Sequence, residues 1–223
     1  MILMTEATVE RRIIRVPPVV AFGSRFGRYK PEEEKEVRKV EVKADRVLEQ
    51  LIAAWKKLGD GRRYGDALRY VADIDYSAKD VENFSITLAE FQDEERFADK
   101  AGYLLSALVN NGKDTEYVIH THHLSQKIDY LGYANTKNIL VDGDAGNFVG
   151  QLMKGGKITV NGKAGEGAGM WLAGGAIIVN GNVDCSVGLG MTGGEISING
   201  EIGSIVLVGQ GKIYHKGVLI VDK

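Results

Sequence analysis

The C-terminal part of this chain repeats itself with a 19-residue period, and this repeat constrains the fold more than any other feature of the sequence. The three clearest copies are VGQLMKGGKITVNG from Val149, AGMWLAGGAIIVNG from Ala168 and VGLGMTGGEISING from Val187. A short period with fixed glycines is typical of a solenoid whose units cannot bury a core alone. The columns identical in all three copies are Gly150/Gly169/Gly188, Gly155/Gly174/Gly193, Gly156/Gly175/Gly194, Ile158/Ile177/Ile196, Asn161/Asn180/Asn199 and Gly162/Gly181/Gly200.

Each copy contains one predicted β-strand. In KITV, AIIV and EISI the second and fourth residues are always isoleucine or valine, so both point to one face of a strand. Stacked turns therefore bury columns of isoleucine and valine. Gly-Gly before the strand and Asn-Gly after it predict two corners with positive φ. The asparagine column predicts a ladder in which each side-chain amide is hydrogen-bonded to the next.

Two weaker copies extend the repeat in both directions. NILVDG at Asn138–Gly143 is in register one period upstream, and GKIYHKG at Gly211–Gly217 follows with a short deletion. The sequence also concentrates its glycines here, since 21 of the 29 follow Asp142. We therefore predict a mainly β fold in which residues 130–223 form a parallel β-helix of about five turns.

The stretch GLGMTG, from Gly188 to Gly193, also matches the G-x-G-x-x-G pattern of dinucleotide-binding proteins. That pattern cradles phosphate only between a preceding strand and a following helix. Here the next residues, EISINGEIG, alternate and break at Asn-Gly, which predicts a strand and a turn. We assign these glycines to the corners of the repeat.

These turns resemble the GXGXG repeat domain, found at the C-terminal end of the glutamate synthase large subunit and in one subunit of formylmethanofuran dehydrogenase. The resemblance covers residues 130–217 and depends on the joint spacing of G…G…M/L-x-G-G-x-I-x-V-N-G. It implies a right-handed β-helix without catalytic residues, which positions domains or subunits that carry out redox chemistry. No amidotransferase or synthase domain precedes the repeat in this sequence, so residues 1–129 lie outside the resemblance.

The N-terminal residues predict a basic arm over 1–31 and a smaller α/β cap domain over 32–129. A long helix is expected from Pro31 to Leu58, because acids crowd its first turns and glycines follow its end. NFSITLAEF alternates and predicts a strand, ERFADKAGYLLSALVNNG predicts a helix, and TEYVIHTHHL predicts a second strand. Such a cap would cover the strand edge of the first solenoid turn.

The histidines of the HTHH stretch are the one cluster in the sequence that suggests chemistry. In a strand, His120 and His122 point the same way about 7 Å apart, which suits two metal ligands. A third ligand is open between His123, Asp129 and a distant carboxylate. The alternative is a strand with ordinary surface histidines, so no catalytic, cofactor-binding or metal residue is assigned.

Composition limits the function classes. A net charge of −2 gives no general attraction to nucleic acid or anionic membranes, and the single Cys185 excludes an intramolecular disulfide. No apolar run suits a membrane span, so a cytoplasmic location is expected. We expect a non-catalytic structural or scaffold protein, with no cofactor, that binds another protein subunit or itself. The alternatives are a metal-dependent enzyme using His120 and His122, and a small-ligand binder using the cleft between cap and solenoid.

Overall fold

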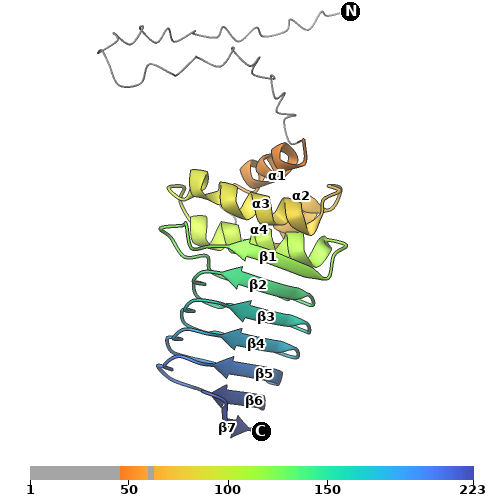
Figure 1. The fold of residues 1–223 in the computed structure, drawn as a ribbon. Helices are drawn as coiled ribbons and strands as arrows, with labels where there is room; N and C mark the ends of the chain where they lie inside the picture. Colours follow the sequence, from red (N-terminus) through yellow and green to blue (C-terminus); the bar gives the residue numbers. More distant parts are fainter. Residues whose placement is uncertain (1–45, 60–62) are drawn as a thin grey trace, which may run out of the picture. The chain divides into compact units, whose positions relative to one another are not determined.

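The computed structural model describes residues 46–59 and 63–223. The expected N-terminal arm and the predicted start of the long helix at Pro31 lie outside the described residues. Within the described part, a stack of strands continues directly from a group of helices (Figure 1).

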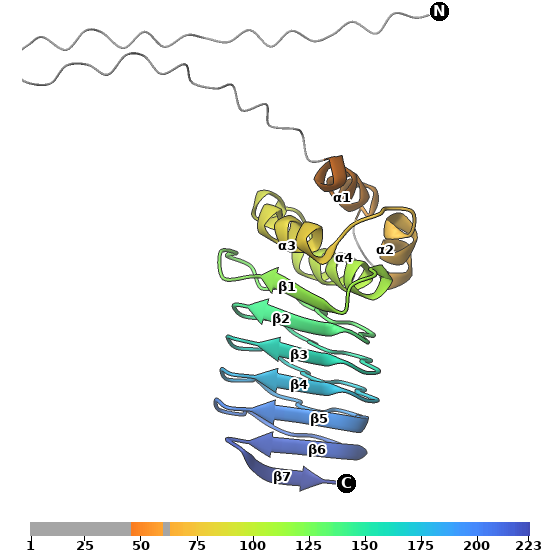
Figure 2. The same cartoon turned by 45° about the vertical axis from the view of Figure 1, so that its right-hand side comes forward.

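The strands confirm the predicted mainly β solenoid of about five turns. In the described part of the chain, seven strands form one sheet in the order in which they occur in the sequence (Figure 2). Neighbours from β1 to β6 are parallel, whereas β7 turns back and pairs antiparallel with β6. The strands are β1 (Glu116–His120), β2 (Asn138–Asp142), β3 (Lys157–Val160), β4 (Ala176–Val179), β5 (Thr192–Ile198), β6 (Gln210–His215) and β7 (Val218–Asp222).

The strand register shows why the sequence repeat identified the later turns of the solenoid and missed the first. Residues 138, 157, 176 and 195 pair in succession, which is the 19-residue period, and 195 pairs with 212 because the last copy is shorter. Glu116 pairs with Asn138, which is a longer, 22-residue interval. Strand β1, which the sequence placed in the cap of residues 32–129, is therefore the first strand of the solenoid sheet.

The predicted inward columns are confirmed. The isoleucines and valines at the second and fourth position of the repeated motif in β3, β4 and β5 are fully buried. The same alternation in β1 and β2 buries Ile119 and Val141 completely. Burial of an aliphatic side chain contributes about 1.5–3 kcal/mol, so these columns account for much of the solenoid's stability.

A second corner of each turn uses left-handed backbone at alternate residues. Three alternate residues have positive φ in each regular turn. Their N–H groups donate to carbonyl oxygens of neighbouring turns, except that the Ser186 N–H donates to the Ser204 hydroxyl. Leu152 and Trp171 adopt this conformation at the position of Gly190, although it is unfavourable for residues with a Cβ. The sequence placed Gly188 and Gly190 at a corner of the repeat, but it did not predict left-handed backbone at the non-glycine positions. The corner consists of Phe148/Gly150/Leu152, Gly167/Gly169/Trp171 and Ser186/Gly188/Gly190.

The two predicted corners, Gly-Gly and Asn-Gly, require glycine for different reasons. Gly156 has φ +71°, as expected for the Gly-Gly corner. The positive φ predicted at the Asn-Gly corner is wrong for Gly162. A Cβ added there would lie 2.7 Å from the Gly143 carbonyl oxygen, so this glycine allows close backbone approach instead.

The helices only partly match the sequence predictions. Helix α4 confirms the predicted helix, and α1 confirms the C-terminal part of the long one. The strand predicted in NFSITLAEF is wrong, because these residues lie in α3 and η1, and a capping box of Ser77 and Asp80 begins α3. The helices are α1 (Arg46–Lys57), α2 (Tyr64–Val71), α3 (Ala78–Thr87), η1 (Leu88–Phe91) and α4 (Phe97–Asn111), which we term the helical cap.

Helix α3 lies over the outer edge of β1. The His120 N–H donates to the Ser85 hydroxyl at 3.1 Å, and Ser85 is fully buried. This contact satisfies part of a strand edge that would otherwise be exposed. The expected role of the cap at the first turn is thus visible in the structure.

Candidate functional site

The candidate site begins at the C-terminal end of β1 and β2. His120 and Asp142 are direct partners in the parallel register. Their preceding neighbours Ile119 and Val141 point into the core, so the alternation of a strand turns both side chains outward on the same face. Sheet register alone therefore brings an imidazole and a carboxylate together.

Among the described residues, His120, His122 and Asp142 form a group whose ligand atoms all lie within 4.8 Å of one another. Asp142 Oδ2 lies 2.9 Å from His120 Nδ1 and 3.5 Å from His122 Nδ1. His120 is mostly buried, whereas 62% of the His122 side chain is exposed. We term these three residues the imidazole–carboxylate cluster.

Helix α3 adds a second carboxylate to the cluster. Glu82 Oε1 lies 3.2 Å from His120 Nε2 and 3.0 Å from Lys79 Nζ. Both ring nitrogens of His120 thus face carboxylate oxygens, an arrangement that an imidazolium satisfies with two N–H donors. Glu82 and Asp142 together tie the helical cap to the solenoid through one side chain.

This geometry shifts the titration of the cluster. Burial lowers the pKa of His120, but hydrogen bonds with Glu82 and Asp142 outweigh it and leave that pKa above its ordinary value. The pKa of Asp142 is lowered, chiefly by its hydrogen bond with His120. The pKa of Glu82 is lowered by Lys79 first and His120 second. The three pKa shifts therefore share a cause: the charged forms of His120, Asp142 and Glu82 stabilise one another.

The structure corrects the predicted arrangement of the histidines. His122 lies in a turn beyond the end of β1, so its closeness to His120 comes from the turn and not from strand alternation. The carboxylate that joins them is Asp142. His123 Nε2 lies 3.1 Å from the Ile86 carbonyl oxygen instead, and Asp129 accepts a hydrogen bond from the backbone N–H of Asn147.

The predicted asparagine ladder is confirmed and leads to this cluster. Asn199 Nδ2 lies 2.9 Å from Asn180 Oδ1, and Asn180 Nδ2 lies 3.5 Å from Asn161 Oδ1. Asn161 in turn hydrogen-bonds to the Asp142 side chain. The next two rungs of the same column are therefore Asp142 and His120. The sequence carried this signal, because NILVDG has aspartate where other copies have asparagine.

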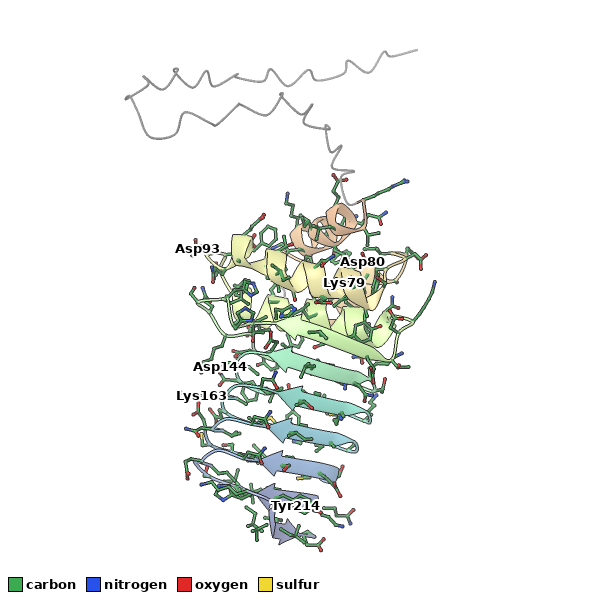
Figure 3. All side chains as sticks on the ribbon, viewed as in Figure 1. Lys79, Asp80, Asp93, Asp144, Lys163 and Tyr214 are labelled. Carbon is green, nitrogen blue, oxygen red and sulfur yellow. The ribbon has the colours of Figure 1, made fainter. Side chains whose placement is uncertain are left out.

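A surface depression of about 340 Å³ adjoins the cluster. Its lining includes His122, Gly143, Asp144 and Thr121, whose side chain is almost fully buried. The Thr121 hydroxyl has no hydrogen-bond partner among the described residues. Figure 3 shows Asp144 near Lys163 of the next turn, and Lys163 N donates to Asp144 Oδ1 at 2.8 Å.

A different kind of surface lies at the opposite end of the solenoid. Strand β7 exposes three consecutive large apolar side chains, Val218, Leu219 and Ile220, and Leu207 before β6 is 82% exposed. In the described part of the chain, β7 has β6 as its one sheet neighbour. We term Leu207, Val218, Leu219 and Ile220 the C-terminal apolar surface.

The remaining motifs are structural. Gly188 and Gly190 have positive φ, and the next element is strand β5, so the dinucleotide pattern has no helix behind it. Near the junction of helices and solenoid, the Tyr103 ring packs against the rings of Tyr130 and Tyr133. Tyr117 is buried in the core apart from these contacts.

Comparisons of this chain with protein-family models, with curated proteins and with solved structures found no match. In the described residues, no helix combines the length and apolar character needed to cross a membrane.

Proposed function

We propose that this protein is a non-catalytic, cytoplasmic scaffold subunit of a redox or amidotransferase assembly. In this proposal the solenoid packs against another polypeptide and positions it. The resemblance of residues 130–217 to the GXGXG domain supports the class of assembly. The observation that carries the proposal is the C-terminal apolar surface.

Strand β7 is suited to protein contact for two reasons. A strand at the end of a sheet presents unpaired N–H and C=O groups, which a partner's strand can pair with. Val218 is 64% exposed, Leu219 43% and Ile220 46%, so the strand buries little of its apolar area within this chain. Large apolar side chains exposed on an edge strand are typical of interaction sites in soluble proteins. We therefore expect a partner that adds a strand to β7.

The test is gentle purification of the full chain from its source cell, followed by native mass and identification of co-purifying proteins. The informative variant is Val218→Lys with Ile220→Lys, which places charges on the β7 surface. Its matched control is Leu140→Lys, because Leu140 is also an exposed apolar residue but lies on β2. A stoichiometric redox or amidotransferase subunit that is lost only in the β7 variant supports the proposal.

Other outcomes of this experiment contradict it. A monomer without a partner removes the basis for a scaffold. A dimer of this chain lost in the β7 variant assigns the surface to self-association. A partner retained in the β7 variant moves the interface elsewhere.

The second candidate is a metal-dependent enzyme that uses His120 and His122. The observation that favours it is the imidazole–carboxylate cluster beside a depression. Elemental analysis of the purified protein tests this second candidate, because a metal-dependent enzyme requires a bound ion and a protein without metal leaves the scaffold alone.

A further inference from the structure

The imidazole–carboxylate cluster has the donors, the spacing and the surroundings of a metal site. We infer that His120, His122 and Asp142 bind one divalent transition-metal ion, such as Zn²⁺. This inference is independent of the proposed scaffold function. Two imidazoles and one carboxylate are a common ligand set for such ions, and they leave further coordination positions open.

The spacing of the donor atoms fits a single ion. Bonds from zinc to nitrogen or oxygen are about 2.0–2.2 Å long, so neighbouring ligand atoms of a tetrahedral site lie about 3.3–3.6 Å apart. Asp142 Oδ2 lies 3.5 Å from the nearest nitrogen of His122, and its 2.9 Å hydrogen bond with His120 needs to open by only about 0.4 Å for an ion to replace the proton. The third pair lies within 4.8 Å, and His122 is exposed enough to close this gap by a side-chain rotation.

Glu82 supplies the support that metal-binding histidines usually have. A ligating imidazole commonly donates its second N–H to a carboxylate, which fixes the ring and increases its basicity. Glu82 Oε1 holds His120 Nε2 at 3.2 Å, and the other ring nitrogen faces Asp142. Glu82 is itself held by Lys79. His120 is therefore oriented before any ion arrives.

Two features have no role in a simple ion-pair clamp between cap and solenoid. A clamp needs His120, Glu82 and Asp142, but it does not need His122. It also leaves the buried Thr121 hydroxyl without a partner among the described residues, beside the depression. In a metal site, His122 is the third ligand, and the depression gives water or a small oxygen-donor ligand access to the open positions.

The experiment is a titration of the metal-free full chain with Zn²⁺ by calorimetry, and with Co²⁺ by visible absorption. Asp142→Asn is the most informative variant, because it restores the residue that Asn161, Asn180 and Asn199 occupy in later turns and so preserves the ladder. His122→Ala removes a mostly exposed ligand with little effect on folding. His123→Ala is the matched control, since His123 is adjacent but outside the cluster.

We expect the wild type and His123→Ala each to bind one equivalent of Zn²⁺ or of Co²⁺. For each ion, the affinity should be the same in the two proteins. Asp142→Asn and His122→Ala should each weaken binding at least about 100-fold, because two protein ligands hold an ion poorly. Glu82→Gln should weaken it about 10–100-fold and keep the Co²⁺ spectrum, since Glu82 is a positioning residue. Absence of binding by the folded wild type, unchanged binding by Asp142→Asn, or equal loss in His123→Ala would overturn the assignment.

Discussion

Each end of the solenoid has a terminal strand with an open edge, and the two ends cover that edge in different ways. At the N-terminal end, helix α3 lies on the edge of β1 and satisfies it with the buried Ser85, while Glu82 contacts His120. At the C-terminal end, β7 closes the stack with a single antiparallel strand. Its neighbouring side chains Val218, Leu219 and Ile220 remain exposed.

The difference shows that a solenoid can end without its last strand edge being covered. The N-terminal closure buries large side chains of the helical cap, including Trp55 and Phe84, together with polar groups that specify the contact. The C-terminal closure changes strand direction but leaves an apolar edge available. The first end is covered within this chain, whereas the second leaves apolar side chains exposed.

The largest expected effect tests whether the helical cap is part of the folding unit. Phe84 is fully buried in α3, so Phe84→Ala should reduce the free energy of unfolding by about 3–5 kcal/mol. The matched change at the other end, Val218→Lys, should alter it by less than about 0.5 kcal/mol, because Val218 is exposed. Denaturant unfolding followed by circular dichroism measures both. Equal effects at the two ends would remove the contrast.

Zinc should stabilise the folded protein through the imidazole–carboxylate cluster at its N-terminal end. At a free Zn²⁺ concentration of about 100 Kd, the wild type should gain about 2.7 kcal/mol in the free energy of unfolding, since the ion binds the folded state. Chelation should reverse the gain. Thermal unfolding with and without Zn²⁺ provides the measurement, and Asp142→Asn should gain at most about 0.4 kcal/mol, because its binding is at least about 100-fold weaker. A similar shift in both proteins would place the ion elsewhere.

Two glutamate–lysine pairs allow the same chemistry to be compared at the two ends. In the helical cap, Glu94 lies 2.8 Å from Lys100, which is almost fully buried and lies over the Trp55 ring. Glu94→Gln should cost about 1 kcal/mol at neutral pH, because Glu94 is partly exposed and water screens the pair. At the other end Glu201 pairs with Lys216 in full solvent, and Glu201→Gln should change stability by no measurable amount.

The Glu94 pair also gives an acid dependence of known sign. Burial raises the pKa of Glu94, but Lys100 and Trp55 outweigh this and leave that pKa below its ordinary value. The contribution of Glu94 to stability is therefore full above the ordinary glutamate pKa and is lost as the pH falls through the lowered one. Unfolding measured from neutral pH to about pH 3 should show this loss in the wild type and not in Glu94→Gln. The same loss in both would assign it to other groups.

The smallest expected effect concerns the ladder between the ends. Asn180→Ala removes one rung with two side-chain contacts, and it should reduce the free energy of unfolding by about 0.5 kcal/mol, because the rung is exposed. Lys157→Ala, on an exposed position of β3, serves as the control and should have no effect. A larger loss for Asn180→Ala, of about 2 kcal/mol, would exceed what one exposed hydrogen bond contributes and would mean that the ladder couples the ends.

The regular part of the fold was predictable because sequence period and strand register coincide. Strand β1 escaped the repeat because Glu116 pairs with Asn138, an interval longer than the period of the later turns. The alternation of Phe84, Ile86 and Leu88 favoured a strand where α3 forms. Phe84 and Leu88 also lie one helical turn apart, on one face of a helix, and Ile86 is half exposed. The capping box at Ser77 was the signal that decides between the two.

The candidate site was predictable only in part. The sequence singled out His120 and His122, but the partner that joins them depends on register across the irregular connection from β1 to β2. Asp142 was detectable as an aspartate in the asparagine column, once that column is extended upstream. Glu82 was out of reach, because its position follows from how α3 packs on β1.

The number of repeats also determines the length of the solenoid. Each turn pairs only with the turns next to it, and parallel strands lie about 4.8 Å apart. One extra copy of the repeat would therefore separate the imidazole–carboxylate cluster from β7 by about 4.8 Å more while leaving both ends unchanged. The number of copies therefore sets the distance between the imidazole–carboxylate cluster and β7. Duplication or deletion of one copy changes this distance by one strand spacing.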